Sequence, residues 1–425
     1  RVRGLARRRS ADRAVGLDCR MRLGVIGGRL QGTEAAYLAR EAGYEVVLVD
    51  RVADVPATGL VDEFHLFDVT ADEARARRLL SSCDAVLPAC EDRGTLQWLD
   101  KRLADWGVPF VFHRPSYAVS SSKLRSDRLF AEIGLPRPLA WPECGYPVVV
   151  KPSGSSGSEG ITVAGCAADL SRARAALGAA GHDVVVQEFV EGPSLSLEVI
   201  AAGGDIEVLV PTSLEFGADY DCMRVVAPAE ADPRTIAALH DAGRRIAGHM
   251  GLHGLMDLEV MVQGLVPKVI EIDARLPSQT PTAVYHACDL NMVALMVEAC
   301  VGGRLPAVDR TPRRAAVYQH VRASAGGLEV VGEHALATAC PLRRVEGFYG
   351  AHVALTDGPR PDKEWVATIV TRGRDAAEAR REAAGVLEAM ADDLGLRLME
   401  PSPSRPRALR CGAGDSGRSG ARRPL

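Results

Sequence analysis

Two apolar stretches within residues 254–275 carry acidic side chains at alternate positions. Because successive side chains of a β-strand point to opposite faces, Asp257 and Glu259 share one face of the first stretch, and Glu271 and Asp273 share one face of the second. Like charges this close repel at a cost of about 1 kcal/mol or more per pair. Magnesium would relieve the repulsion, because it takes oxygen ligands and combines a few carboxylates with substrate phosphates. The pattern therefore predicts a magnesium site, with a solvated, salt-bridged face as the alternative.

A second pattern suits phosphate binding. Lys151 ends an apolar strand, and the Gly/Ser-rich loop 152–160 follows it. A lysine provides a point charge for phosphate, and small residues let a loop backbone donate N–H groups to it. Lys123 would be a second cation on the same polyanion or a solvated helix charge, and Arg275 could hold a transferred phosphate or a substrate carboxylate. The loop lacks the G-K-[ST] of a Walker A motif, and a flexible linker is the alternative.

A glycine turn at residues 27–32 lies between a predicted strand and a predicted helix, which is typical of an anion site. Arg29 occupies the position of the second glycine in the dinucleotide fingerprint, whereas Asp50 has about the spacing of its ribose acid. An NAD-binding domain and a purely structural turn therefore both stay open.

Residues 187–192 form a strand end whose backbone could hydrogen-bond a flat base while Phe189 and Val190 pack on it. Ordinary core packing at a strand end is the alternative.

The apolar periodicity predicts an α/β chain of several parts. We expect a Rossmann-like domain at 21–113, with strands at 22–26, 45–49, 84–88 and 109–112 and a helix at 33–42. A small αβ domain follows at 114–190, with helices at 120–133 and 167–180 and strands at 146–151, 161–164 and 183–189. A strand-rich domain covers 191–400, with strands at 195–201, 207–214, 223–226, 255–262, 267–273, 315–322 and 365–371 and helices at 233–250, 291–300 and 376–394. Residues 1–20 and 401–425 are expected to be disordered extensions, although the Arg-rich N-terminus could be a transit peptide.

Composition excludes several classes of partner. The 425 residues carry a net charge of -4, which gives no electrostatic support for a nucleic-acid partner. No apolar run approaches the roughly 18 residues of a membrane span. The ten cysteines form no C-x-x-C pair, which fits reduced thiols in the cytosol. We therefore expect a cytoplasmic protein that acts on small molecules, without nucleic acid or membrane as partners and with a homodimer left open.

The order of these motifs resembles the ATP-grasp superfamily from about residue 21 to about residue 309. The resemblance implies ATP and Mg²⁺ as cofactors, and a Rossmann-like N-terminal domain, a small αβ lid and a mixed-sheet catalytic domain. Four stretches, at 28–37, 196–200, 220–222 and 271–285, are similar to the ligases of pyrrolysine biosynthesis that join the carboxylate of (3R)-3-methyl-D-ornithine to the side-chain amine of L-lysine.

The resemblance also implies roles for individual residues. ATP would be contacted by Arg29, Asp50, Asp62, Glu63, Lys123, Lys151, Ser153, Ser155, Ser156, Glu188, Phe189 and Val190. L-Lysine would be contacted by Leu30, Gln31 and Glu91, and methylornithine by Glu198, Asp221, Arg275 and Ser278. Magnesium would be bound by Asp257, Glu271 and Asp273. Catalysis would involve Lys151, Arg275, Glu91 and Asp221, with Glu91 and Asp221 as candidates for taking the amine proton.

Three alternatives remain at this point. Another ATP-grasp amino-acid ligase, dipeptide ligase or carboxylase would share every motif except those for the substrate. An NAD-dependent dehydrogenase would leave the acidic strands unexplained. A non-catalytic nucleotide-binding protein would bind ATP but release no phosphate.

Overall fold

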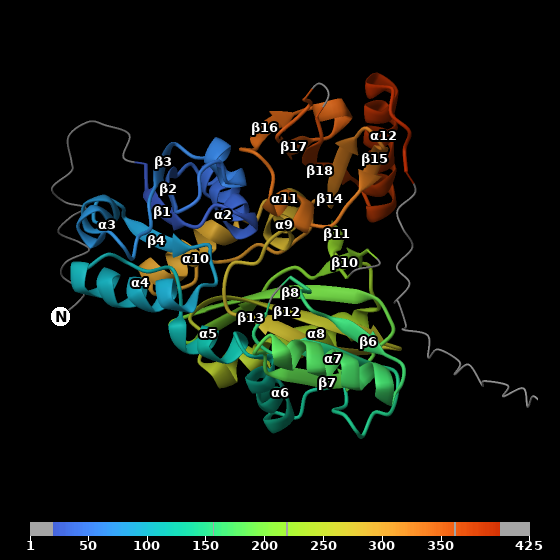
Figure 1. Ribbon diagram of the computed structural model, residues 1–425. Helices are drawn as coiled ribbons and strands as arrows, with labels where there is room; N and C mark the ends of the chain where they lie inside the picture. Colours follow the sequence, from blue (N-terminus) through green and yellow to red (C-terminus); the bar gives the residue numbers. More distant parts are fainter. Residues whose placement is uncertain (1–19, 156, 218–219, 361–362, 400–425) are drawn as a thin grey trace, which may run out of the picture.

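The computed structural model describes residues 20–399, apart from residues 156, 218–219 and 361–362. Apart from residue 20, the expected extensions 1–20 and 401–425 therefore lie outside the described residues. Within the described part of the chain, the strands form three sheets (Figure 1).

The first sheet is parallel, with the order β3 (Glu63–Leu66), β2 (Glu45–Asp50), β1 (Arg22–Ile26) and β4 (Ala85–Pro88). Its helices are α2 (Leu30–Glu41), α3 (Glu73–Leu80), α4 (Arg93–Trp106) and the 3-10 helix η2 (Pro56–Leu60). From β1 the chain adds β2 and β3 on one side of the sheet and then β4 on the other side, so the strand order reverses between β1 and β4. In open α/β sheets, ligands bind outside the carboxyl ends of the strands at such a switch point.

The turn after β1 depends on Gly27, which has φ +105°. A side chain at this position would place its Cβ 2.5 Å from the backbone oxygen of Ala89, the residue after β4. Glycine therefore lets the turn pack closely against the neighbouring strand end.

The second sheet is small and antiparallel. Its order is β6 (Thr162–Ala164), β5 (Val148–Pro152) and β7 (Val184–Glu188), and α7 (Ala167–Ala179) packs on it. Helices α5 (Arg114–Ser120) and α6 (Lys123–Glu132) connect it to the parallel sheet. We call β5, β6, β7 and α7 the lid.

The third sheet runs from the centre of the molecule to the C-terminal region. Its path is β13 (Val266–Asp273), β12 (Gly254–Gln263), β8 (Ser194–Ala202), β10 (Thr212–Phe216), β11 (Cys222–Ala227), β14 (Ala315–Ser324), β18 (Trp365–Gly373), β17 (Val353–Thr356) and β16 (Arg343–Glu346), and β9 (Asp205–Val208) and β15 (Gly327–Val330) pair with β8 and β14. The region after Asp309 thus continues the sheet.

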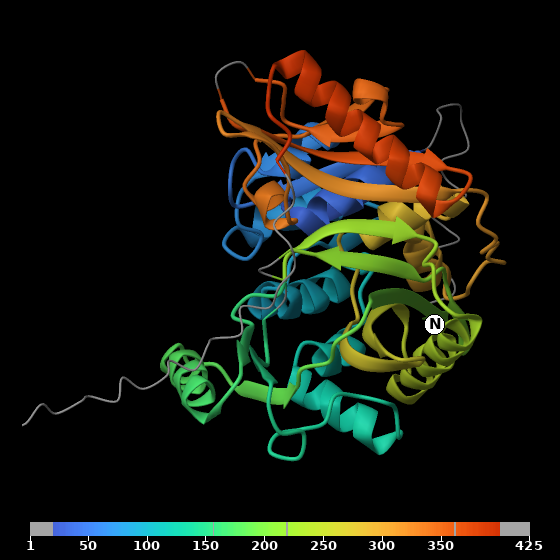
Figure 2. The ribbon, with the colours of Figure 1, turned by 90° about the vertical axis from the view of Figure 1, so that its right-hand side faces the viewer.

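Helices close the remaining faces of this sheet. Helix α8 (Pro233–Met250) packs on β8 and β9, and α12 (Ala376–Leu394) covers β18 and β14 (Figure 2). Helices α9 (Thr280–Cys288) and α10 (Met292–Gly302) lie between the sheet and α2, in one apolar core shared with the parallel sheet. The short α11 (His334–Ala337) and the 3-10 helix η3 (Phe348–Gly350) complete the C-terminal region.

Several expected elements differ from the observed ones. The expected helix 120–133 is observed as α6, which begins three residues later, and α5 before it was not expected. Helix α2 begins three residues earlier than expected. The expected strand 207–214 is two strands, β9 and β10, because Pro211 between them has no backbone N–H to continue a ladder. Residues 109–112 contribute one parallel bridge, from Phe110 to Val86, and no strand.

No single helix in the described part of the chain has the length and apolarity to cross a membrane. Helices α9 and α10 meet that test only as a pair bent by 102°. Helix α9 is almost entirely buried, and α10 buries the face that contains Met292, Met296 and Ala299.

Candidate active site

Three cavities lie in a row where the sheets meet. The lid cavity, of about 710 Å³, is lined by the lid and the central strands, and the N-terminal cavity, of about 500 Å³, lies at the carboxyl edge of the parallel sheet. The junction cavity, of about 90 Å³, shares Glu259 and Glu271 with the lid cavity and Arg275 and Ser278 with the N-terminal cavity. The two larger cavities have the size of small-molecule sites, so two ligands could meet at the junction.

The end of β7 forms one wall of the lid cavity. Glu188, Phe189 and Val190 all line it. The Glu188 carboxylate accepts a hydrogen bond from the Leu139 N–H at 3.0 Å and pairs with Lys268 at 2.7 Å, which holds it against the wall. The phenyl ring and the valine supply apolar surface of the kind that lines sites for flat aromatic ligands.

One lysine, Lys151, lines this cavity, and a second, Lys123, pairs with Glu271 in its wall. Lys151 is buried, and its Nζ donates to the Ile270 carbonyl oxygen at 3.2 Å. Burial lowers the pKa of its ammonium, an effect that the nearby Glu271 carboxylate opposes. The Lys123 Nζ pairs with Glu271 Oε1 at 2.5 Å. A polyphosphate would compensate both ammonium groups.

The loop between β5 and β6, which we call the lid loop, lies against Lys123. The Ser153 carbonyl accepts the Lys123 backbone N–H at 2.8 Å, and the Ser155 carbonyl accepts the Lys123 Nζ. Ser156 lies outside the described residues. Gly157 and Ser158, further along the loop, line the junction cavity, so the loop contacts Lys123 and borders the junction.

Carboxylates cross three adjacent strands in two rows. Asp257 in β12 lies opposite Glu198 in β8 on one side and opposite Asp273 in β13 on the other. Glu259, at the next alternate position of β12, lies opposite Glu271 in β13. Directly opposed residues and alternate residues share a face of a sheet. All five acids therefore face the same side, as the alternation predicted for the four acids of β12 and β13.

Burial and crowding shift these carboxyls toward the protonated form. Burial raises the pKa of Glu198 to about 7. Burial, followed by the charges of Glu271 and Asp273, raises the pKa of Glu259 to about 8. Burial, followed by Asp273 and Glu259, raises the pKa of Asp257 well above its ordinary value. The acidic face therefore favours any ligand that brings positive charge.

The donor atoms suit a divalent cation that is bound together with phosphate. Asp257 Oδ1 and both carboxylate oxygens of Glu198 are buried without a hydrogen-bond partner in the described part of the chain. Among those residues, no three acidic, histidine or cysteine side chains enclose a metal position. Mg²⁺ usually takes one or two carboxylates and completes its shell with phosphate and water. One or two carboxylates from among Asp257, Glu271 and Asp273 would fit that mode.

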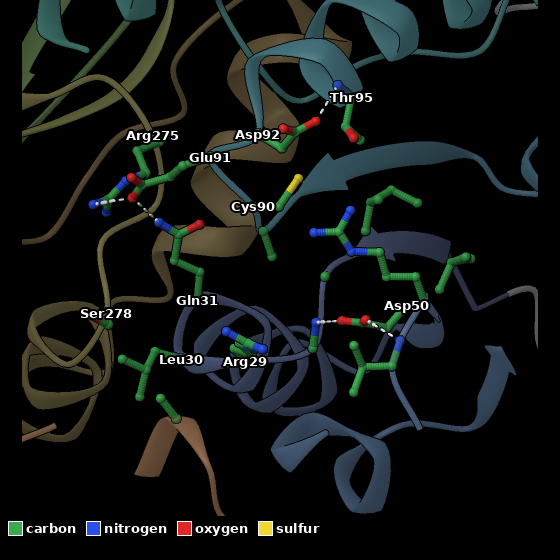
Figure 3. Close-up of a pocket in the computed structure, with 18 of the residues that line it drawn as sticks. Arg29, Leu30, Gln31, Asp50, Cys90, Glu91, Asp92, Thr95, Arg275 and Ser278 are labelled. Carbon is green, nitrogen blue, oxygen red and sulfur yellow. Dashed lines mark hydrogen bonds and ion pairs between the residues drawn. The ribbon is translucent and has the colours of Figure 1, made fainter. Parts of the chain in front are cut away.

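The N-terminal cavity contains a bridge of polar side chains (Figure 3). Gln31 Nε2 donates to Glu91 Oε1 at 2.8 Å, and Arg275 Nη2 pairs with the same oxygen at 2.8 Å. Arg275 also pairs with Asp273 at 2.9 Å. Burial opposes its charge, but Asp273 and Glu91 raise the pKa of the guanidinium. The bridge thus connects the start of α2 to the acidic face.

Four more of the residues predicted to contact ligands line the N-terminal cavity. Arg29, Leu30 and Ser278 line it, as does Asp50. The Asp50 carboxylate accepts the backbone N–H groups of Gly28 and Val52, each at 2.8 Å, and so braces the glycine turn (Figure 3).

Asp221 lines the junction cavity beside α11. Its Oδ2 pairs with His334 Nδ1 at 2.9 Å and accepts the His334 backbone N–H at 3.2 Å. A side chain at Gly332 would place its Cβ 2.0 Å from that oxygen, so only glycine leaves room for the carboxylate. Glu333, next in the chain, accepts hydrogen bonds from Ser278 Oγ at 2.8 Å and Gln279 Nε2 at 2.7 Å.

The structure does not bring every expected residue to the cavities. Asp62 pairs with Arg40 at 3.1 Å, and Glu63 pairs with Arg22 at 2.8 Å, at the amino ends of the parallel strands. That edge is opposite the N-terminal cavity. Arg29 and Asp50 are in the N-terminal cavity, whereas the predicted hinge is in the lid cavity. Glu198 belongs to the acidic face but is fully buried and lines none of the three cavities.

Sequence analysis missed Glu333, His334 and Gln279. Glu333 and His334 flank the start of α11, which has only four residues and no periodicity to mark it. Gln279 lies within a stretch that resembles the ligases, but its φ of +73° has no signature in a non-glycine residue.

The fold and the site together define an ATP-grasp enzyme. Residues 120–279 match the family described as ATP-grasp domain. Biotin carboxylase from Campylobacter jejuni, solved in a complex with β,γ-ATP, superimposes with a TM-score of 0.69 at 16% identity, covering 86% of this chain and 91% of that chain. At that identity the likeness concerns the fold alone.

The family follows from two relatives. The 3-methyl-D-ornithine–L-lysine ligase of Methanosarcina mazei is 32% identical over 84% of this chain and 91% of its own length. The ligase of the same name from Methanosarcina barkeri is 33% identical over 83% and 93%. The chain belongs to the family of 3-methyl-D-ornithine–L-lysine ligases, and it is an ATP-grasp ligase.

Proposed function

We propose that the protein joins the carboxylate of (3R)-3-methyl-D-ornithine to the ε-amine of L-lysine, with ATP as the phosphate donor, in pyrrolysine biosynthesis. One observation carries the proposal: the lid cavity and the N-terminal cavity meet at a junction lined by Glu271, Asp273 and Arg275. A nucleotide in the first cavity and an amine in the second would thus approach the same small space from two sides.

The lid cavity supports the nucleotide. Phe189 and Val190 line it and would pack on adenine. Lys151, which also lines it, and Lys123, which pairs with Glu271 in its wall, would hold the phosphates. Mg²⁺, when bound, neutralises phosphate charge, and Asp257, Glu271 and Asp273 would hold it there. Catalysis by these residues would be mainly positioning and electrostatic, because fixed charges around the phosphate need no rearrangement during transfer.

The junction cavity supports a diamino acid. Arg275 can hold a carboxylate, because its planar guanidinium matches that group. Asp221 and Glu333 lie across the same cavity and suit ammonium groups. A substrate with one carboxylate and two amines matches this arrangement better than a carboxylic acid without amino groups does.

The N-terminal cavity supports the lysine amine. Leu30, Gln31 and Glu91 line it. The carboxylate of Glu91 pairs with the guanidinium of Arg275, which also lines the junction cavity. The attacking amine must lose a proton, and Glu91 and Asp221 would be the candidates to take it. The lid loop would exclude water, which otherwise hydrolyses the activated acid.

Phosphate release and product mass test this function. The purified protein is incubated with Mg²⁺-ATP and 3-methyl-D-ornithine or D-ornithine, with and without L-lysine. We expect lysine-dependent phosphate release and a product whose mass equals the two amino acids less one water. A folded, ATP-binding protein that forms no such product, but forms an amide from another acid and amine, would overturn the substrate assignment.

A further inference from the structure

Two helices begin at the two substrate cavities and pack against each other. Helix α2 starts with Leu30 and Gln31, which line the N-terminal cavity, and α9 starts directly after Ser278 and Gln279, which line the junction cavity. The relative position of these two helix starts therefore sets the distance between the amine and the acid.

One buried carboxylate joins the two helix starts. Glu34 of α2 is 2% exposed, and its Oε1 accepts the Thr282 backbone N–H in the first turn of α9 at 2.6 Å. The first N–H groups of a helix have no partner within the helix, and Gln279 at the N-cap of α9 provides no side-chain cap. Glu34 supplies the cap from a segment 248 residues away in sequence.

The loop that Glu34 holds is strained. Gln279 has φ +73° and ψ -58°, a conformation that a non-glycine residue keeps only when its surroundings fix it. Its side chain is held from one side by Glu333, at 2.7 Å. The Glu34 carboxylate fixes the backbone of the following turn from the other side.

The same face of α2 contacts α9 at two further points. Tyr37 hydrogen-bonds His286 at 2.8 Å, and Glu41 accepts from the Tyr285 hydroxyl at 3.1 Å. These contacts are one and two turns further from the cavities. They align the helices but do not hold the loop at Ser278 and Gln279.

We propose that Glu34 is a positioning residue that fixes the Ser278–Gln279 loop relative to Leu30 and Gln31, so that the activated acid and the amine meet. The inference rests on the proposed function and deepens it. Without Glu34 the enzyme still activates the acid, but the amine reaches it in poor geometry and water competes.

The ratio of amide formed to phosphate released tests the proposal. In Glu34→Ala, amide formation falls by up to about 100-fold, because small displacements of reacting groups cost that much. Phosphate release continues, so the ratio falls while the KM for ATP stays unchanged. Glu34→Gln restores the ratio, because an amide oxygen also accepts the Thr282 N–H. Glu41→Gln is the matched control on the same helix, and it keeps the wild-type ratio.

Hydrogen exchange separates this proposal from the proposed function. In the free protein, Glu34→Ala accelerates exchange in peptides covering residues 275–283, whereas Glu41→Gln does not. A wild-type ratio together with wild-type exchange in Glu34→Ala would overturn the proposal. A Glu34→Gln variant whose ratio of amide to phosphate is as low as that of Glu34→Ala would also overturn it. If the wild-type protein makes no amide from this pair, the proposed function fails, and the exchange measurement still decides whether Glu34 fixes the loop.

Discussion

Glu198 and Asp257 lie directly opposite each other in the adjacent strands β8 and β12, although both are buried carboxylates. Asp273 lies opposite Asp257 on the other side. Three acids in one row across a sheet are destabilising unless protons or cations compensate them. The row therefore lowers the stability of the free protein and raises its affinity for a positively charged ligand.

The first prediction concerns this row. In Asp257→Asn, the free energy of unfolding of the metal-free protein rises by about 1 kcal/mol, because one repulsive partner is removed. The variant loses the increase in melting temperature that Mg²⁺-ATP gives the wild-type protein. Thermal unfolding with and without Mg²⁺-ATP measures both effects. Asp62→Asn, a carboxylate change at the distant edge of the parallel sheet, keeps the ligand-induced increase; a loss there would restore Asp62 as a nucleotide contact.

The second prediction concerns Lys151. Replacing it with methionine removes a buried cation at the lid cavity and lowers turnover by about 100- to 1,000-fold, the usual cost of one electrostatic contact to the transition state. The protein stays folded, since methionine fills the space of the aliphatic stem. Steady-state phosphate release measures the loss, and Lys101→Met, on the exposed side of α4, is the control. Turnover near the wild-type value in Lys151→Met would remove this lysine from the site.

The third prediction separates the two substrates. Glu91→Gln raises the KM for L-lysine by about 10- to 100-fold, because a hydrogen bond to a charged group contributes about 1.5–3 kcal/mol. The KM for ATP changes little, since Glu91 lines the N-terminal cavity and not the lid cavity. Initial rates at varied lysine and varied ATP give both constants. An equal rise in both would place Glu91 in nucleotide binding.

The parts of the fold that are visible in the sequence are those with strict periodicity. The pairing of Asp257 with Asp273 and of Glu259 with Glu271 follows from the period of two in β12 and β13 and the short turn between them. The strand and turn before α2 were visible because apolar runs and glycines mark them. Apolar runs also mark the strand ends at Lys151 and Glu188, which both line the lid cavity, and their contact with ATP stays a prediction.

The parts that were missed depend on long-range contacts. No local signal brings Glu198 beside Asp257, because β8 and β12 are separated by three strands and a helix in the chain. Glu333 reaches Ser278 only because β14 and β15 return the chain to the junction. Asp62 and Glu63 were expected near nucleotide, yet the parallel register places them at the amino edge, where Arg40 and Arg22 pair with them. Sequence spacing gives no information about which edge of a sheet such residues occupy.

The fourth prediction concerns pH and a histidine away from the cavities. His320 in β14 is 1% exposed, and its Nδ1 contacts Thr368 Oγ1 at 2.9 Å. Burial lowers its pKa to about 3, against about 6.5 in an unfolded chain. Above pH 6.5 neither state binds the proton, so this group adds no pH dependence. Below pH 6.5 only the unfolded chain binds it, and stability falls by up to about 1.4 kcal/mol per pH unit.

A variant that cannot titrate isolates this effect. His320→Gln keeps a polar group that can reach Thr368 and lacks the proton uptake. Between pH 7.5 and pH 5.0 the wild-type protein therefore loses about 2 kcal/mol more than the variant. Other buried groups, such as Glu34 and His286, titrate alike in both proteins and cancel in the difference. Urea unfolding at the two pH values measures it, with His65→Gln in the partly exposed β3 as the control. Parallel losses in wild type and His320→Gln would show that His320 is protonated in the native protein, because only a native state that binds the proton removes the difference.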